Sequence, residues 1–454
     1  MQQVKDKLSY IRGKAAAFIE SDKFIYLVAA IVLSFSLLGW DLAGFYVLIL
    51  LCSFILCSNL DIRATTPIII MMCFVLSIQN SPLRDTSASY FLSTTSLVSL
   101  SVLAAVLLTS MVYGAIKRGL RVRLTLNFWG VFALVPAFVF GGIFYKGYSA
   151  ASMLVGLVMS LYFFGAFVYF SLYIKRGDFD FIAKTILVLS LIGSVQLGVL
   201  YLTSDWLRQT LDKGAIMIGW GNSNSIAIML VIGMPPALYY AAKSKHPVLF
   251  FVLTCVLAAA TVFTYSRAAL LFAVPICVGG TVYAVFKQRG RGRIGLLIAG
   301  GALVAAFIGF VGVKWNLFVR AMDFYIQTGI DDRGRYELLV EAFNKFLSAP
   351  LFGVGAYDSV GVAQTYIFFY HNMFFQFLAW SGIFGFVMYS GHLVTMFLTG
   401  IKHPAEKRTF LLLVILAATG HSMLDCVLYY PYLTFVYMLC LAYADRDLTA
   451  DADK

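Results

Sequence analysis

Charged residues are scarce in this sequence. Asp, Glu, Lys and Arg make up 12% of the 454 residues, whereas apolar residues make up 61%. The mean hydropathy of +0.86 lies far outside the range of soluble domains. The composition therefore excludes a soluble enzyme and predicts an all-α polytopic membrane protein, with residues 1–454 forming a single membrane domain.

Several common functional motifs are also missing. The chain has no glycine-rich phosphate-binding loop, no long linker and no internal repeat of the kind found in many transporters. All seven cysteines fall in apolar runs without metal-ligand spacing, which predicts buried packing rather than disulfides or a metal site. The first apolar run lacks a small-residue cleavage site, which predicts an uncleaved anchor rather than a signal peptide.

Long apolar runs dominate what is present. A membrane-spanning helix needs about 20 apolar residues, and we expect about 14 spans (12 to 14), with short runs such as 66–79 being spanning or re-entrant. The expected runs are 24–39, 42–58, 66–79, 93–113, 126–143, 150–174, 181–203, 223–242, 247–264, 267–286, 294–312, 371–398, 409–427 and 430–444.

The basic residues predict the orientation. With the N-terminus and C-terminus in the cytoplasm, most of the 34 Lys and Arg residues fall on the inner side, including the clusters at 117–123 and 287–293. This is the positive-inside pattern of membrane proteins. It accounts for the net charge of +12, so neither nucleic acid nor a phospholipid-binding face is needed to explain it.

One segment breaks the pattern of short loops. Residues 313–370 are too long for a simple connection and mix aromatic with charged residues, so we expect an extracytoplasmic loop that folds against the membrane and contributes to the active site. The apolar spacing over Tyr336 to Leu347 predicts a helix. Pro350, Gly353 and Gly355 are expected to end that helix and turn the chain.

A histidine and three arginines are predicted to share the outer membrane level. His371 opens the twelfth apolar run, Arg267 lies between the ninth and tenth runs, and Arg333 and Arg335 lie in the long loop. A lone arginine at a membrane boundary often only extends its charge to water. Three together favour a phosphate or pyrophosphate ligand, because the guanidinium group offers a planar fork of donors and stays charged.

These residues carry a family resemblance. In order along the second half of the chain, the motifs resemble those of the O-antigen ligase and O-antigen polymerase superfamily, and a segment of the first half is also similar. The residues concerned are Thr264, Ser266 and Arg267; Gly334 and Arg335; Pro350 to Gly355; His371, Asn372, Gly382 and Gly385; and Gly221 to Ala227.

The resemblance implies a glycosyltransferase with a GT-C-like fold in a bacterial inner membrane, its active site facing the periplasm or exterior. It implies an undecaprenyl-pyrophosphate-linked glycan as donor, with metal-independent inverting transfer and no cofactor. The implied acceptor is a second lipid-linked repeat unit for a polymerase, or lipid A core for a ligase. Fourteen runs slightly favour the polymerase. Membrane lipid is an expected partner, as is a chain-length regulator or flippase.

The resemblance also implies residue roles. Arg267 and Arg335 would hold the pyrophosphate with help from Arg333, and His371 would act as base on the acceptor hydroxyl, with Asn372 and Ser266 in support. Fixed arginines can stabilise the charge that builds on a leaving pyrophosphate, which removes the need for a metal cation. A general base contributes typically 10² to 10⁴ in rate.

Simpler or different explanations exist for each residue. His371 could be an interfacial anchor like its neighbouring tyrosines, and Asp331 and Asp332 could bind a divalent ion or form a solvated ion-pair cluster. His421 and Asp425, four residues apart, could be a structural hydrogen-bonded pair or part of the acceptor site. A lipid or sugar transporter is the second function class, although transporters usually carry ionisable groups near the bilayer midplane.

Overall fold

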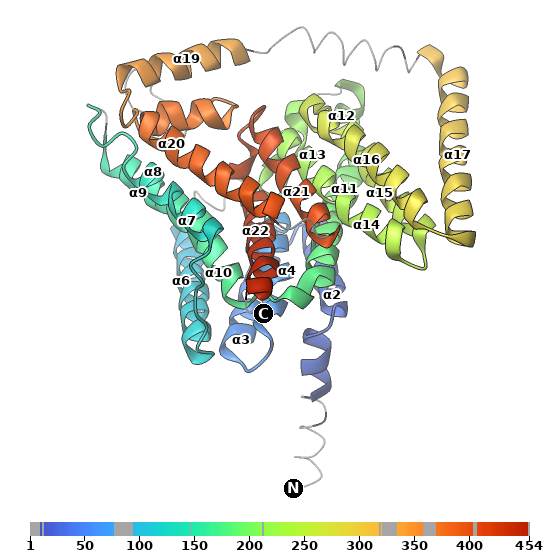
Figure 1. Cartoon of the computed structure of the whole chain (residues 1–454), viewed down its shortest axis with the longest axis horizontal. Helices are drawn as coiled ribbons and strands as arrows, with labels where there is room; N and C mark the ends of the chain where they lie inside the picture. The colour runs from blue at the N-terminus through green and yellow to red at the C-terminus, as the bar shows by residue number, and fades with distance from the viewer. Residues whose placement is uncertain are drawn as a thin grey trace.

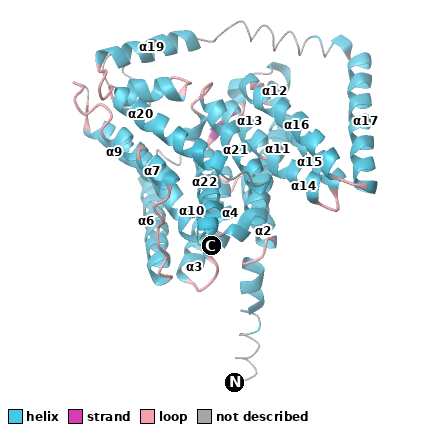
Figure 2. Ribbon diagram, viewed as in Figure 1, coloured by secondary structure: helices cyan, strands magenta, loops and turns pink. Residues whose placement is uncertain are grey.

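The structure is a computed structural model that describes residues 10, 13–76, 94–146, 148–210, 213–316, 319, 334–356, 369–402 and 406–452. Within these ranges the chain is almost entirely helical, as Figure 2 shows, and its only sheet is a two-stranded antiparallel ribbon. In that ribbon Met217 pairs with Asn222 and Ile218 with Gly221. Gly219, with φ of 56°, begins the two-residue turn, where glycine tolerates the positive φ that the turn needs.

The elements of the first half are α2 (Lys23–Leu37), α3 (Asp41–Cys57), η1 (Ile62–Ala64), α4 (Thr65–Met71), η2 (Met72–Phe74), α6 (Thr94–Lys117), α7 (Leu126–Phe132), α8 (Leu134–Val139), α9 (Ala150–Ser160), η3 (Leu161–Gly165), α10 (Ala166–Tyr173), η4 (Arg176–Asp178), α11 (Phe179–Thr203), α12 (Asp205–Thr210) and η5 (Lys213–Ala215). The second half contains β1 (Met217–Ile218), β2 (Gly221–Asn222), α13 (Ser223–Ile232), α14 (Met234–Lys243), α15 (Pro247–Phe263), α16 (Arg267–Lys287), α17 (Gly290–Val313), α19 (Arg335–Ser348), α20 (Met373–Lys402), α21 (Glu406–Ser422), η6 (Val427–Tyr429) and α22 (Pro431–Ala452).

Seven helical segments among the described residues are long and apolar enough to cross a membrane, so the chain is a polytopic integral membrane protein. They are Val98–Lys117, Ala150–Tyr173, Arg176–Thr203, Ser223–Lys243, Arg267–Lys287, Gly290–Val313 and Met373–Ile401. Five further apolar helices are shorter, from 10 to 17 residues. The predicted count of fourteen spans and the GT-C-like fold therefore remain predictions.

The segment formed by α13 and α14 lies at the centre of the protein. Of its most apolar window, 94% is buried, against 6% for α17. Figure 1 shows α17 along the right edge, apart from the central helices. Because α17 is apolar on all sides and barely covered by protein, its surface suits contact with lipid chains.

The described part of the apolar run expected at 66–79, which ends at residue 76, forms a short buried element. The helices η1, α4 and η2 follow one another over Ile62–Phe74, too few residues to cross a bilayer as one helix. Thr65 and Thr66 lie fully buried, and their hydroxyl groups hydrogen-bond those of Tyr169 and Tyr173 in α10 at 2.5 and 2.8 Å. These hydrogen bonds give the threonine hydroxyl groups partners, which lipid chains could not provide.

Helix α20 is interrupted at Gly382, and the turn after α19 docks into the break. Gly382 has φ of 62° and ψ of −158°, a conformation open almost only to glycine. The backbone N–H of Val354 donates to the carbonyl of Ala379, and that of Ile383 donates to the carbonyl of Pro350, both at 2.8 Å. The turn therefore satisfies backbone groups that the interrupted helix leaves open.

The helix predicted over Tyr336 to Leu347 is confirmed by α19. It begins after Gly334, which adopts φ of 74°, and it is amphipathic, with only Ala342 fully buried. In Figure 1 it lies along the upper edge of the molecule over α20, at the opposite end from the loop that follows α6. This places Arg335 at the end of the protein where α20 begins.

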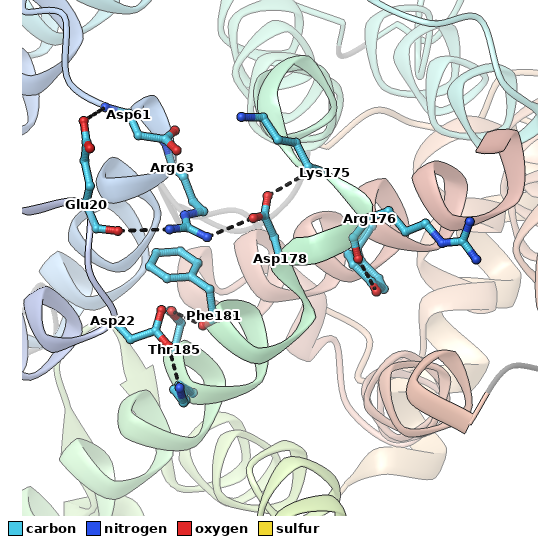
Figure 3. A network of polar contacts seen from close by, with 11 residues as sticks. Glu20, Asp22, Asp61, Arg63, Lys175, Arg176, Asp178, Phe181 and Thr185 are labelled. Atoms are coloured by element: carbon cyan, nitrogen blue, oxygen red, sulfur yellow. Dashed lines mark hydrogen bonds and ion pairs between the residues drawn. The ribbon is translucent and has the colours of Figure 1, made fainter. Parts of the chain in front are cut away.

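A network of polar contacts joins the elements at the other end of the molecule (Figure 3). The Arg63 guanidinium binds Asp178 at 2.9 Å and the carbonyl of Glu20 at 3.0 Å, and it stacks over the ring of Phe181, 4.6 Å from the ring centroid. Asp178 also accepts a hydrogen bond from the backbone N–H of Lys175 at 2.8 Å. These contacts fasten α2, η1 and α11 together at the face that the basic clusters predict to be cytoplasmic.

Candidate active site

The first turn of α20 is fixed by its capping residue, Asn372. The Asn372 side-chain oxygen accepts hydrogen bonds from the backbone N–H groups of Phe374 and Phe375 at 2.9 and 3.2 Å. Its amide group donates to the carbonyl of Met423 at 2.8 Å, in the segment that follows α21. Asn372 thus caps one helix and ties it to the end of another, which positions the residue directly before it.

That preceding residue is His371, which forms a pair with Asp425. The His371 Nδ1 atom lies 2.7 Å from Asp425 Oδ1, with the histidine side chain 37% exposed and the aspartate side chain 5% exposed. His371 has φ of 52°, which is unusual for a non-glycine residue and is typical of functional sites. The buried carboxylate therefore orients a histidine ring whose other face remains accessible.

Two further polar residues continue from this pair into the protein. The Asn224 side chain, at the start of α13, donates a hydrogen bond to the second carboxylate oxygen of Asp425. Lys213 in η5 donates in turn to the side-chain oxygen of Asn224 at 2.5 Å. Both Asp425 oxygens are thus occupied, and a four-residue chain of contacts runs from Lys213 to His371.

These contacts keep Asp425 ionised. Burial by itself would raise the pKa of Asp425. The hydrogen bonds from His371 and Asn224 oppose this and hold the pKa of Asp425 below its usual value. An ionised carboxylate only accepts hydrogen bonds, so Nδ1 of His371 carries the proton. In the neutral ring, Nε2 then holds the free electron pair.

His421 lies beside this chain but does not bond to Asp425 through its ring. The His421 side chain is fully buried, and neither ring nitrogen has a hydrogen-bond partner among the described residues. Its ring lies 6.4 Å from that of Phe272 in α16. The positive charges of Lys213 and Arg335 both act on it. The predicted role of Arg335 in binding pyrophosphate stays a prediction.

The junction between α15 and α16 holds Arg267 and Ser266. Arg267 is the first residue of α16, with an exposed side chain, five positions before the Phe272 that faces His421. Tyr265 has φ of 56°; in the described part of the chain it and His371 are the only non-glycine residues with positive φ. Ser266 is buried, and within the described ranges its hydroxyl has no hydrogen-bond partner.

The structure thus brings together part of the predicted site. His371 and Asn372 lie together at the start of α20. Arg335 is the first residue of α19, and Arg267 is the first residue of α16, the helix whose Phe272 lies near His421. Arg333, Asp331 and Asp332 lie outside the described residues, and within those residues no group of three or more His, Cys, Asp or Glu side chains is arranged to hold a metal ion.

Sequence reasoning did not assign Asn224 and Lys213, and it paired Asp425 with His421 rather than with His371. A partial signal was present, because Asn224 lies within the Gly221 to Ala227 segment already noted for its resemblance. The separation of 201 residues between Asn224 and Asp425 left no pattern that could join them.

The structure thus combines a helical membrane bundle with a histidine that a buried carboxylate orients at the start of α20. Residues 249–390 match the family model described as O-antigen ligase, which supports the resemblance to the O-antigen ligase and polymerase superfamily, a group of glycosyltransferase-like enzymes. The matched segment contains Arg267, Arg335 and His371. Neither curated proteins nor solved structures gave a match.

Proposed function

We propose that this protein transfers a glycan from an undecaprenyl-pyrophosphate carrier to a sugar hydroxyl at the outer face of the bacterial inner membrane. The observation that carries the proposal is the His371–Asp425 pair, because it leaves Nε2 of an oriented histidine available as a proton acceptor. The family match supports the reaction type.

In the proposed reaction, the acceptor hydroxyl oxygen attacks the anomeric carbon of the donor. The bond between that carbon and the pyrophosphate oxygen breaks, and its electron pair leaves with the pyrophosphate. The hydroxyl proton passes to Nε2 of His371, and Asp425 stabilises the imidazolium that results. Attack from the side opposite the leaving group inverts the anomeric centre.

The leaving pyrophosphate needs positive charge, which Arg267 and Arg335 would supply. Both begin helices, α16 and α19, and the backbone N–H groups of a first helical turn also favour an anion. Fixed donors of this kind stabilise developing charge without reorganising, often the largest single contribution to catalysis. In this scheme the arginines stabilise the leaving group, and His371 accepts the proton of the acceptor hydroxyl.

A second lipid-linked repeat unit is the proposed acceptor, which makes the protein a polymerase of O-antigen or a related surface polysaccharide. The fourteen apolar runs of the sequence favour it over a ligase acting on lipid A core. The alternative of a lipid or sugar transporter is less well supported, since an ion pair that orients one histidine ring serves proton transfer more directly than substrate passage.

The deciding experiment incubates purified protein with lipid-linked repeat units and no other acceptor. A polymerase produces a ladder of longer glycans, whereas a ligase produces none until lipid A core is added. If neither product forms and the intact lipid-linked glycan instead moves across a vesicle membrane, the proposal is overturned in favour of a transporter.

The ladder of glycans should persist in excess EDTA. Loss of the ladder, with rescue by Mg²⁺, would shift the assignment to Asp331 and Asp332.

A further inference from the structure

A second polar site lies at the opposite end of the molecule from His371. A cavity of about 500 Å³ opens between the segment after α3, the loop after α6, the end of α10 and the end of α22. Five of its lining side chains are cationic and one is acidic. They are Arg118, Arg123, Lys175, Arg176, Arg446 and Asp61.

Two of the cations are held in place by backbone carbonyl groups. The guanidinium of Arg118 donates to five carbonyl oxygens, among them those of Ile55 and Leu56 in the last turn of α3, at 3.3 and 2.8 Å. Arg446 donates to the carbonyl of Ser171 at 2.8 Å. The carbonyl groups that hold Arg118 are neutral, so they position its side chain without neutralising its positive charge.

The hydrogen bonds described for the acids in this region go to groups other than the cationic side chains of the cavity. Asp178 binds Arg63, and Figure 3 shows the Arg176 side chain directed away from it. The carboxylate of Asp61 accepts from the backbone N–H of Arg63 at 3.0 Å. Asp445 accepts hydrogen bonds from the side chains of Thr125 and Asn127, and its charge also acts on Arg446.

The cationic side chains also act on one another across the cavity. Burial and the positive charge of Arg123 lower the pKa of Arg446, and the negative charge of Asp445 opposes them. An anion bound in the cavity would offset the repulsion between the cationic side chains that line it. Arginines suit phosphate in particular, because their planar fork of donors matches its oxygens.

Apolar residues share the cavity with the cations. Leu120, Leu172 and Ile174 line it, and it opens beside the ends of two helices long enough to span the membrane, α6 and the segment ending with α10. A ligand placed here therefore meets positive charge and hydrocarbon together. This combination is found where basic pockets between membrane helices hold lipid headgroups.

We propose that this cavity binds a phosphate-bearing anion, supplied by the headgroup of an anionic membrane phospholipid. The positive charge at this end of the molecule then has a second role besides setting the orientation in the membrane. The basic loop at 117–123 and the end of α22 together form a lipid-binding site. The inference does not depend on the glycosyl transfer proposed above.

The test titrates phosphatidylglycerol or phosphatidylcholine into delipidated full-length protein and counts bound lipid by native mass spectrometry. We expect preference for phosphatidylglycerol. Arg123→Gln and Arg176→Gln, both at exposed side chains, should each weaken its binding about fivefold, and their combination should weaken it further. Arg121→Gln is the matched control, because Arg121 is exposed in the same loop but does not line the cavity.

Equal binding of the two lipids, or unchanged phosphatidylglycerol binding by the double variant, would overturn the proposal. Inorganic phosphate alone forms the third arm. If wild type binds millimolar phosphate and the double variant does not, while the two lipids bind equally, the anion site stands and the lipid source is wrong. Circular dichroism of each variant checks that the helical fold is intact, and either single variant suffices if the double variant does not fold.

Discussion

Single residues decide the proposed chemistry, and the most informative is His371. The sequence predicted its position at the start of a membrane helix, but its backbone conformation and its carboxylate partner became visible only in the structure. A positive φ cannot be inferred from the side chain itself, because histidine only occasionally adopts that conformation. The partner lies 54 positions away, beyond the reach of helical or strand periodicity.

Replacing His371 by Ala should separate binding from chemistry. The variant loses the proton acceptor but keeps the arginines, so glycan transfer should fall at least about 10²-fold while donor binding in nanodiscs stays near wild type. If donor binding were abolished instead, His371 would be a substrate anchor and the proposed mechanism would be wrong.

Asp425→Asn tests the orientation of the ring. The amide keeps the shape but loses the charge, and it can present a donor to Nδ1, which favours the wrong tautomer. Transfer should fall about 10²- to 10⁴-fold with donor affinity unchanged. Asp205→Asn, at an exposed aspartate that pairs with the nearby Arg208, is the control and should transfer normally. Equal activity of the two variants would remove Asp425 from the mechanism.

Arg267→Lys and Arg335→Lys test the pyrophosphate clamp. Each keeps the positive charge but loses the bidentate fork, so we expect about a tenfold or greater loss of transfer with weaker donor binding. Arg208→Lys, at an exposed arginine with a local partner, should have no effect. Normal turnover by both variants would identify the two arginines as boundary charges without a catalytic role.

At the scale of elements, the helix and the glycine-rich turn of the long loop were the most predictable parts. Amphipathic spacing located α19 to within a residue at each end. Docking of the turn after α19 against a break in α20 could not be predicted, because Gly382 lies within a continuous apolar run. The short elements over Ile62–Phe74 show the same limit: composition shows that a run is buried but not whether lipid or protein covers it.

The break in α20 predicts a strong position dependence for glycine substitution. At Gly382 an added Cβ would lie 2.5 Å from the backbone carbonyl carbon of Leu351 in a conformation closed to alanine, so Gly382→Ala should destabilise the protein by about 2–4 kcal/mol. Gly391 lies in the same helix, and a Cβ added there would meet no described atom within 4 Å. Gly391→Ala should therefore leave the melting temperature unchanged or raise it slightly. Thermal unfolding in detergent measures both, and equal melting temperatures would show that the break is not required.

At the scale of the whole molecule, composition was enough to predict a helical membrane protein, and the ordered motifs were enough to predict the family model that residues 249–390 match. The number of spans was harder to obtain. Helices such as α7 and α8 are short and interrupted, and hydropathy alone does not distinguish a spanning helix from one buried among others. Which residues meet at the site depended on contacts between distant segments, which one sequence does not encode in any local pattern.

The predicted orientation can be tested directly with single cysteines in a background where the native cysteines are replaced. Tyr336→Cys in α19 and Arg121→Cys in the loop after α6 are both at exposed positions near opposite ends of the molecule. In intact cells an impermeant maleimide should label the first and not the second. The reverse pattern would place the proposed active site in the cytoplasm and exclude the reaction proposed here.

The chain of contacts from Lys213 through Asn224 and Asp425 to His371 also bears on how the enzyme is made. Its members enter the membrane in a fixed order as the ribosome lengthens the chain, and Asp425 arrives last, 201 residues after Asn224. Until then His371 has no carboxylate to hold its ring, and a truncated or stalled chain carries the arginines without an oriented base. If His371 acts as proposed, we expect glycan transfer only from chains whose final helices are in place.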